Sequence, residues 1–265
     1  LKSLPVSLSF NELCNEIIYK PITRFYKREF IVGNQILQTI RSDLTQIISY
    51  KNGAIKINTH INDLIINISI SMIPKHWIRY VVPSTLSLNS WIQDFSTRLD
   101  HLEKLIVALS KNSILSIVNT PVRIGKFFFP EAFTTALRQL SSRKLKLPLE
   151  ELSLKVTIID SATEINRINN TEFIVFGLKI LGSRLNNMVL ELSEDFVTDL
   201  PYFQIEWGSK KLQTQDNSLF VSLPLYLDTS RKNTLFNIDL PTPLNVNSEL
   251  FYQHGVAVFA NNYSN

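Results

Sequence analysis

One short run, residues 125–133, constrains the fold of this chain more than any other feature. It holds Phe127, Phe128 and Phe129 in succession, then Pro130 and, three residues later, Phe133. Three consecutive aromatic side chains cannot share one face of a helix or a strand, so the run must be buried on more than one side. We call residues 125–133 the seam. We interpret it as a core junction between two subdomains rather than as a ligand pocket, because aromatic clusters at element boundaries are usually packing.

The residues before the seam have the apolar spacing of helices. Residues 21–48 carry an apolar stripe of period 3.6, and Asn52-Gly53 is a strong signal for the turn that ends it. Residues 57–72 fit a helix over their whole length and a strand over part of it. We predict a helix there, since the segment is longer than a usual strand and Pro74 closes it.

An ordered loop and then two further helices are predicted after this segment. Residues 74–83 form that loop, pinned by the aromatic side chains of Trp77 and Tyr80. Ser87 is a good N-cap for a helix over residues 88–109. The next helix begins at the seam with Pro130, whose fixed φ suits a first helical turn, and runs out at residues 143–146.

The residues after the seam alternate between apolar and polar, as strands do. Strand-length runs lie at residues 152–158, 173–181, 188–192, 202–207, 219–227, 234–240 and 255–260. Seven short strands fit a barrel or a sandwich, and turn-forming clusters such as residues 182–187 separate them. Pro224 inside a strand run argues for an edge or a bulge at that point, which leaves closure of the barrel open.

The predicted fold class is therefore α+β, with an N-terminal long-helix subdomain followed by a C-terminal antiparallel β-barrel, closed or incomplete. We place a leader at residues 1–20, the helical subdomain at 21–146 and the barrel subdomain at 147–265. Residues 1–150 hold 19 basic and 10 acidic residues, a net charge of +9, while residues 151–265 hold 8 and 13, a net charge of −5. We expect the two halves to attract each other, or each to face a different neighbour.

The composition argues against several classes of function. The basic residues are scattered and lack interleaved stacking aromatics, so no nucleic-acid partner is expected. Cys14 is the only cysteine, which excludes an internal disulfide and favours a reducing compartment. The apolar stretch at residues 64–73 is too short and too interrupted to span a bilayer, so no membrane partner is expected either. The chain opens on Leu1 without an initiator methionine, which suggests a piece of a longer polypeptide.

Catalytic patterns are absent from the sequence. Gly125-Lys126 is followed by Phe127 and lacks the upstream glycine, so it is not a phosphate-binding loop. The histidines, at positions 60, 76, 101 and 254, are far apart in sequence and lack the i, i+4 pairing of a metal site, and no metal is expected. No nucleophile elbow occurs, and the acidic pairs lie in hydrophilic turns. We expect no catalytic, cofactor-binding or metal-binding residue, which favours a structural or regulatory module.

Motifs with a characteristic order run along residues 21–262. Those before the seam are Arg28-Glu29, Gly33, Leu37, the run 41–44, Ile73-Pro74, Trp77, Tyr80, Trp91, Phe95 and Arg98. Those from the seam onward are residues 128–133, Arg138, the runs 149–152, 177–178, 181–182 and 200–201, Trp207, Pro224 and Tyr226 within the run 223–227, Arg231, Phe251-Tyr252 and Gly255. This series resembles the C-terminal domain of dynein heavy chains, and Glu131 and Arg138 with their neighbours resemble the cytoplasmic class more than the ciliary classes.

The resemblance implies a non-catalytic segment that follows the sixth AAA+ module of a minus-end-directed microtubule motor. Its residue signature here is Trp91, Phe95, Glu131, Arg138, Pro224, Tyr226, Arg231 and Gly255. The implied partners are the AAA+ ring modules of the same heavy chain, with no direct microtubule contact, and the leader would come from the preceding AAA+ region. ATP would be bound only by the AAA+ modules, and the implied location is the cytoplasmic cytoskeleton.

One position departs from the family pattern, because Lys126 stands where the family usually has glycine. A positive φ at this position would cost lysine steric strain. The rival hypothesis is a free-standing helical-plus-barrel module that binds some other protein. A gene that encodes a much longer polypeptide would favour the dynein interpretation.

Overall fold

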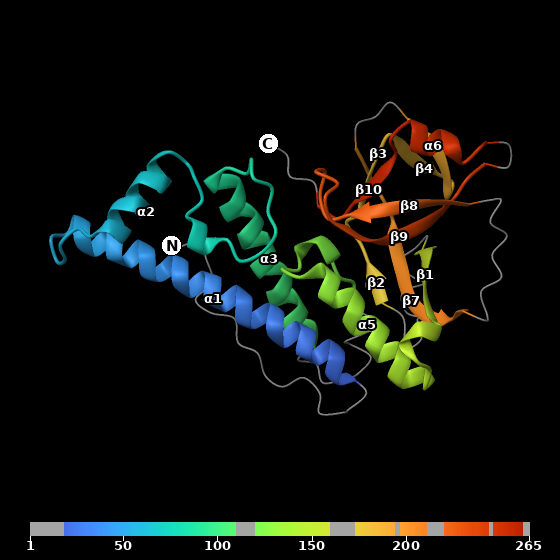
Figure 1. Cartoon of the computed structure of the whole chain (residues 1–265), viewed down its shortest axis with the longest axis horizontal. Coiled ribbons are helices and arrows are strands. Elements are labelled where there is room, and N and C mark those ends of the chain that lie inside the picture. Colours follow the sequence, from blue (N-terminus) through green and yellow to red (C-terminus); the bar gives the residue numbers. More distant parts are fainter. Residues whose placement is uncertain are drawn as a thin grey trace.

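The computed structural model describes residues 19–109, 120–159, 173–193, 197–210, 220–243 and 246–261. The long helices occupy one end of the molecule and the strands the other, where a short helix, α6 (Glu249–Gln253), lies among them, as Figure 1 shows. Residues 1–18 of the predicted leader and a short apolar run at residues 114–118 lie outside the described residues. The change from helices to strands occurs after α5, but the exact division at residues 146 and 147 stays a prediction.

The predicted helices are confirmed. They are α1 (Lys20–Lys51), α2 (Thr59–Ser69), α3 (Leu88–Leu109) and α5 (Pro130–Leu145), with short 3-10 turns η2 (Lys75–Trp77), η3 (Ile124–Lys126) and η4 (Leu149–Glu151). The segment at residues 57–72 forms a helix and not a strand. Its N-terminus is capped by Asn58, whose Oδ1 accepts the backbone N–H of Ile61 at 2.8 Å.

Local chemistry sets the other helix ends. Ser87 Oγ accepts the backbone N–H of Ser90 at 3.2 Å, so the predicted cap of α3 is confirmed. Helix α1 ends where Gly53 adopts a φ of +73°, which glycine allows without steric cost. Helix α5 starts at Pro130 and stops at Lys146, which takes the left-handed conformation that ends many helices.

The strands form three sheets. They are β1 (Leu152–Ile159), β2 (Phe173–Val175), β3 (Lys179–Leu181), β4 (Ser183–Asn186), β5 (Val189–Leu192), β6 (Thr198–Asp199), β7 (Tyr202–Ser209), β8 (Phe220–Tyr226), β9 (Thr234–Pro241) and β10 (Ala257–Phe259). The sheet orders are β1-β7-β2, β6-β3-β10-β8-β9 and β4-β5. These sheets do not close into a barrel within the described residues, so the incomplete form is the one observed.

The strand boundaries differ from the sequence prediction in three places. The predicted strand at 173–181 is split into β2 and β3 around Gly177, whose φ is +73°. The predicted turn at 182–187 contains β4, and the true turn is Asn187-Met188, where both residues have positive φ and close the β4–β5 hairpin. A short helix, α6 (Glu249–Gln253), precedes β10, which pairs in parallel with β8 rather than antiparallel.

Pro224 lies inside β8, opposite Asn237 of β9. The register shifts between Leu225 and Tyr226, directly after the proline, so a bulge is present where it was predicted. Strand β10 pairs with β8 only at Leu225 and Tyr226. Pro224 therefore has a paired strand on one side alone, where a residue without an N–H is tolerated.

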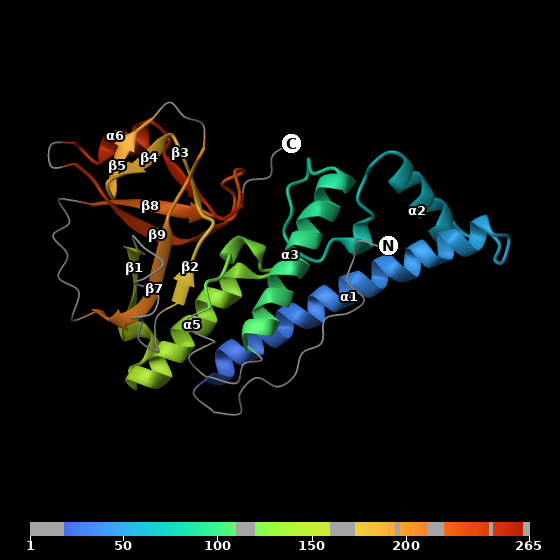
Figure 2. The same cartoon turned by 180° about the vertical axis from the view of Figure 1, so that it is seen from behind.

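Helix α5 joins the two halves of the molecule. It packs against α1 on one side and against β7 and β9 on the other, and both views place it between the helices and the strands (Figure 1; Figure 2). One buried apolar cluster runs from Ile22 and Phe30 on α1 through Phe133 to Leu223 and Ile238 on the strands. The two halves therefore share a single core, which explains why the seam is so apolar.

Candidate functional site

The three consecutive phenylalanines of the seam pack against different sets of neighbours. Phe127 is fully buried, with its ring centroid 4.9 Å from that of Phe25 on α1 and 5.0 Å from that of Phe133 on α5. Phe133 in turn meets Phe173 of β2 edge-on at 5.8 Å. This series of aromatic contacts crosses from the helices to the strands and places the seam at the junction.

The next two phenylalanines, Phe128 and Phe129, have other packing partners. Phe128 is buried, with its ring centroid 5.2 Å from that of Tyr80 and 6.2 Å from that of Phe95 on α3. Phe129 is half-buried, and the guanidinium of Arg28 lies 4.0 Å from the centre of its ring. Burial on several sides thus characterises the first two rings, while the third lies at the rim.

Glu29 is a buried acidic residue that joins α1 to the seam. It is fully buried on the apolar face of α1, and its two carboxylate oxygens accept the backbone N–H groups of Phe128 and Phe129 at 2.6 and 3.0 Å. These donors lie 99 and 100 residues away in sequence. Burial raises the pKa of Glu29 from its ordinary 4.5 to about 7, against the opposing effect of these amides and of Arg98.

This raised pKa predicts a pH dependence. The folded protein retains the proton on Glu29 between pH 4.5 and about 7 while the unfolded protein loses it, so the free energy of unfolding falls as pH rises through this window. The expected loss is about 3 kcal/mol at 1.36 kcal/mol per pKa unit. Urea unfolding of wild type and Glu29→Gln, at pH values near each end of the window, isolates this contribution from other titrating groups. A constant stability difference between the two proteins would show that folding does not raise the pKa of Glu29.

A second buried network holds the seam to α3. The carboxylate of Asp94 accepts hydrogen bonds from Arg98 Nε at 2.7 Å, from Lys126 Nζ at 2.8 Å and from the hydroxyl of Tyr80 at 3.2 Å. Arg98 also donates to the carbonyl of Phe127 at 2.5 Å. Burial raises the pKa of Asp94, but the charges of Arg98 and Lys126 outweigh it and hold the pKa below its usual value. The carboxylate is thus ionised and fixes the course of the loop.

Lys126, at the position where the resemblance leads us to expect glycine, lies in η3 and is not among the residues with positive φ. The steric cost considered from the sequence therefore does not arise, and the lysine gains an ion pair with Asp94. The position that demands a glycine is Gly125. A Cβ there would collide with the carbonyl oxygen of Ala260 and lie 2.7 Å from Asn261 Oδ1, because the backbone beyond β10 passes directly against the loop. Asn261 Nδ2 also donates to the Gly125 carbonyl at 2.6 Å.

The signature residues of the helical part lie in the core of α3 or on α5. Trp91 and Phe95 are fully buried and stacked, with ring centroids 5.5 Å apart. Glu131 is exposed in the first turn of α5, where a negative charge suits the helix dipole. Arg138 links α5 to the strand half, since its guanidinium donates twice to the carbonyl of Leu149, at 2.7 and 3.2 Å, and lies over the ring of Trp207 on β7.

The remaining signature residues gather at one turn of the strand half. Arg231 has a positive φ of 57° and donates to the carbonyl of Gly255 at 2.9 Å, while Gly255 has a φ of +68°. The guanidinium of Arg231 lies over Phe259, which stacks on Tyr226. Together with Pro224 in β8, these residues shape the β8–β10 region. The structure thus divides the signature between the core of α3, the surface of α5 and this turn.

A cleft of about 300 Å³ lies beside the seam and is lined by His101, Lys104, Arg123, Lys126 and Phe176 among others. Most of its basic groups already have partners within the protein. Lys126 pairs with Asp94 and Arg123 lies over the ring of Phe176. Burial and the neighbouring charges of Arg123 and Lys126 lower the pKa of His101 to about 3, so its imidazole is neutral. We therefore assign no ligand to this cleft.

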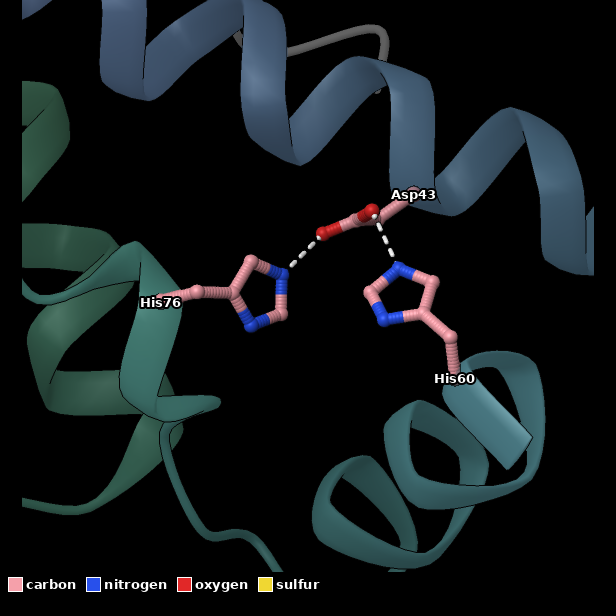
Figure 3. A group of neighbouring side chains, drawn as sticks. All are labelled: Asp43, His60 and His76. Carbon is pink, nitrogen blue, oxygen red and sulfur yellow. Dashed lines mark hydrogen bonds and ion pairs between the residues drawn. The ribbon is translucent and has the colours of Figure 1, made fainter.

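The fold also brings together two histidines that the sequence suggested were isolated. His60 Nε2 lies 3.0 Å from Asp43 Oδ1, and His76 Nε2 lies 2.6 Å from Asp43 Oδ2 (Figure 3). The buried Trp77 donates its indole N–H to the same carboxylate at 2.6 Å. Burial raises the pKa of Asp43, but the hydrogen bonds from Trp77, His76 and His60 outweigh it and keep the pKa below its ordinary value. Spacing along the sequence could not reveal this cluster, because its three members come from α1, α2 and η2.

Comparison with known proteins decides the family. The profile of the family described as the C-terminal domain of the dynein heavy chain matches residues 2–260. The protein belongs to this dynein family. It is 33% identical over 258 residues to the cytoplasmic dynein heavy chain of Drosophila melanogaster and 31% identical to that of Dictyostelium discoideum, each time over 97% of its own length. Dynein axonemal heavy chain 1 of Mus musculus is 25% identical to the protein over 88% of the protein's length.

The protein spans only 6% of the Drosophila dynein heavy chain and 5% of the Dictyostelium one. The higher identities to cytoplasmic heavy chains than to the axonemal one agree with the predicted cytoplasmic class. In the part of this dynein domain that the structure describes, no helix has both the length and the apolar character needed to cross a membrane.

Proposed function

We propose that this domain is a non-catalytic, regulatory and structural part of a dynein heavy chain, and that it packs on the AAA+ ring of the same polypeptide. In this proposal the heavy chain is a minus-end-directed microtubule motor of the cytoplasmic cytoskeleton. Its AAA+ modules bind and hydrolyse ATP, and other parts of it contact the microtubule. The observation that carries the proposal is the family match over residues 2–260.

The distribution of exposed apolar side chains supports docking onto a neighbour. Eight of the fourteen large apolar side chains that are exposed in the described residues lie within residues 48–81. They are Ile48, Ile55, Ile57, Ile66, Ile70, Met72, Ile78 and Val81. Helix α2, at the centre of this region, lies at the end of the molecule farthest from the strands (Figure 1). Such a concentration is typical of an interaction surface, and we assign it to the contact with the ring.

The mechanism follows from contact alone. A domain without catalytic groups can change a motor only by binding some arrangements of the ring more tightly than others. A differential binding energy of about 1–3 kcal/mol would be typical of such coupling. Helices and strands share one core, and Leu64 of α2 lies in it while Ile68 packs against it, so side-chain packing offers contacts at α2 a route to the rest of the domain. Force or processivity is the property that this coupling modulates.

The non-catalytic assignment predicts that the isolated domain does not bind nucleotide. The sequence has no glycine-rich phosphate loop, and the lysine that follows Gly125 is paired with Asp94. Calorimetric titration with ATP and ADP in the presence of Mg²⁺ should therefore show no micromolar site. Saturable micromolar binding would contradict the assignment and favour an additional nucleotide site in this segment.

A further inference from the structure

The cluster of Asp43, His60 and His76 is not used by the seam or by the proposed ring contact. Its members lie on the C-terminal half of α1, the first turn of α2 and η2. One nitrogen of each imidazole and one oxygen of the carboxylate all lie within 4.8 Å of one another. In Figure 3 both rings turn a nitrogen toward the same carboxylate, from opposite sides of the gap between α2 and η2.

We propose that Asp43, His60 and His76 bind one Zn²⁺ ion, which fastens α2 and η2 to α1. Two imidazole nitrogens and one carboxylate oxygen are a ligand set that zinc takes readily, with bonds of about 2.0–2.2 Å. Ligands at this distance around a tetrahedral ion are about 3.3 Å apart. His60 Nε2 lies 3.0 Å from Asp43 Oδ1 and His76 Nε2 lies 2.6 Å from Asp43 Oδ2, so the ligand atoms must move apart to admit the ion. Calcium and magnesium prefer sites built from oxygen atoms and do not fit a set with two imidazoles.

The exposure of the three side chains suits the entry of an ion from solvent. Asp43 is buried beneath the cluster, whereas the side chains of His60 and His76 are 46% and 42% exposed. An ion can therefore approach from the solvent side, and water can complete its coordination. Small rotations of the two exposed rings widen the gap without moving any backbone.

The carboxylate is also held in place, as metal ligands usually are. Trp77 donates its indole N–H to Asp43 Oδ2, and its ring is buried and stacked on Trp91, with centroids 5.9 Å apart. Outer contacts of this kind orient a ligand and contribute to metal affinity. The aromatic core around Trp77 and Trp91 thus presents Asp43 in a fixed position to the two histidines.

The site has a clear structural consequence for α2. Among the side chains of this helix, only Ile61 and Leu64 are buried. Little of α2 is thus anchored in the apolar core, and the hydrogen bond from His60 to Asp43 adds to its attachment to α1. A zinc ion that joined three elements would restrain α2, which carries the exposed Ile66 and is followed directly by the exposed Ile70.

The test is a calorimetric titration of the whole protein with ZnCl₂, in parallel with MgCl₂. All variants include Cys14→Ser, so that no thiol can supply a ligand. The variants are His60→Asn and His76→Asn, because an asparagine amide can still donate to Asp43 but is a poor ligand for zinc. His254→Asn is the matched control, since His254 is exposed and its imidazole bonds the Leu250 carbonyl of the helix that precedes it.

We expect one Zn²⁺ per protein molecule in the wild-type background and in His254→Asn. In His60→Asn and in His76→Asn we expect binding at least tenfold weaker, and no binding of Mg²⁺ in any protein. The visible absorption of Co²⁺ bound to the wild-type background should show tetrahedral coordination, a readout that does not depend on the variants. Equal zinc affinity in all four proteins, or no stoichiometric zinc binding to wild type, would overturn the proposal.

Discussion

Arg98→Met should lower the free energy of unfolding by about 3–4 kcal/mol. Removing one partner of a buried ion pair typically costs about 3–5 kcal/mol, because the other charge stays buried without compensation. Arg98 is fully buried between Asp94 and the carbonyl of Phe127, and its guanidinium lies 4.5 Å from the centre of the Tyr80 ring. Lys126 still pairs with Asp94 in the variant, which places the loss at the lower end of the range. Urea unfolding followed by circular dichroism measures the change.

Two controls separate the buried network from a general loss of charge. Arg98→Lys retains the charge but loses the planar guanidinium with its several donors. It should therefore lower the free energy of unfolding measurably, but by less than Arg98→Met. Arg79→Met removes an exposed arginine that bonds Gln35 at 3.2 Å, and should change stability by less than about 0.5 kcal/mol. Equal losses in Arg98→Met and Arg79→Met would show that Arg98 is not held in the seam as described.

Phe128→Ala should lower the free energy of unfolding by about 3–5 kcal/mol. Truncation of a fully buried phenylalanine loses its transfer free energy and leaves a cavity. Phe128 is 3% exposed and fills the space between Tyr80 and Phe95. A cavity at this point would separate the seam from α3, and thermal unfolding followed by near-ultraviolet circular dichroism should report it.

Phe129→Ala is the matched control for this prediction. Its ring is only half-buried and lies against Arg28, so the substitution should cost about 1–2 kcal/mol, from lost packing and one cation–π contact. The ordering of the two variants is therefore the diagnostic result. Melting temperatures of both variants within a degree of wild type would indicate that the seam is exposed and serves instead as a docking surface.

The helices could be predicted because their information is local. An apolar stripe of period 3.6, a capping serine before α3 and a proline at the start of α5 each act within a few residues. The strands were less predictable where a backbone conformation decided the boundary. Gly177 breaks one predicted strand, and the positive φ of Asn187 and Met188 creates a hairpin inside a predicted turn. The parallel pairing of β10 with β8 joins segments far apart in sequence, which periodicity cannot reveal.

The polar contacts of the site were missed for the same reason. Glu29 and Asp43 lie on the buried face of α1, and an acidic residue on an apolar stripe is a signal that a buried partner exists. That signal does not name the partner. The amides of Phe128 and Phe129 are about one hundred residues from Glu29, and His76 is 33 residues from Asp43. Only the packing of α2, η2 and the seam against α1 brings these groups together.

The measurement that tests the central claim most directly compares single motors in an optical trap, together with their ATP turnover. Three forms of the heavy chain are compared: the intact chain, the chain without this domain, and a double variant that carries Ile66→Asp and Ile70→Asp. Ile66 lies on α2, and Ile70 directly follows that helix. Both isoleucines are exposed, at 48% and 58%, so charge at these positions should disturb docking and not folding. Lys51→Ala, at the end of α1 and also exposed, is the control for a surface substitution without apolar loss.

If the domain acts by contact with the ring, ATP turnover stays within several-fold of normal in every motor. Stall force or run length changes when the domain is removed, and changes in the same direction in the isoleucine variant, while Lys51→Ala matches the intact motor. Coupling of about 1–3 kcal/mol corresponds to changes of about 5–150-fold in the balance between ring arrangements. Loss of ATP turnover from a folded motor without the domain, or stall force and run length that are both unchanged, would contradict this account.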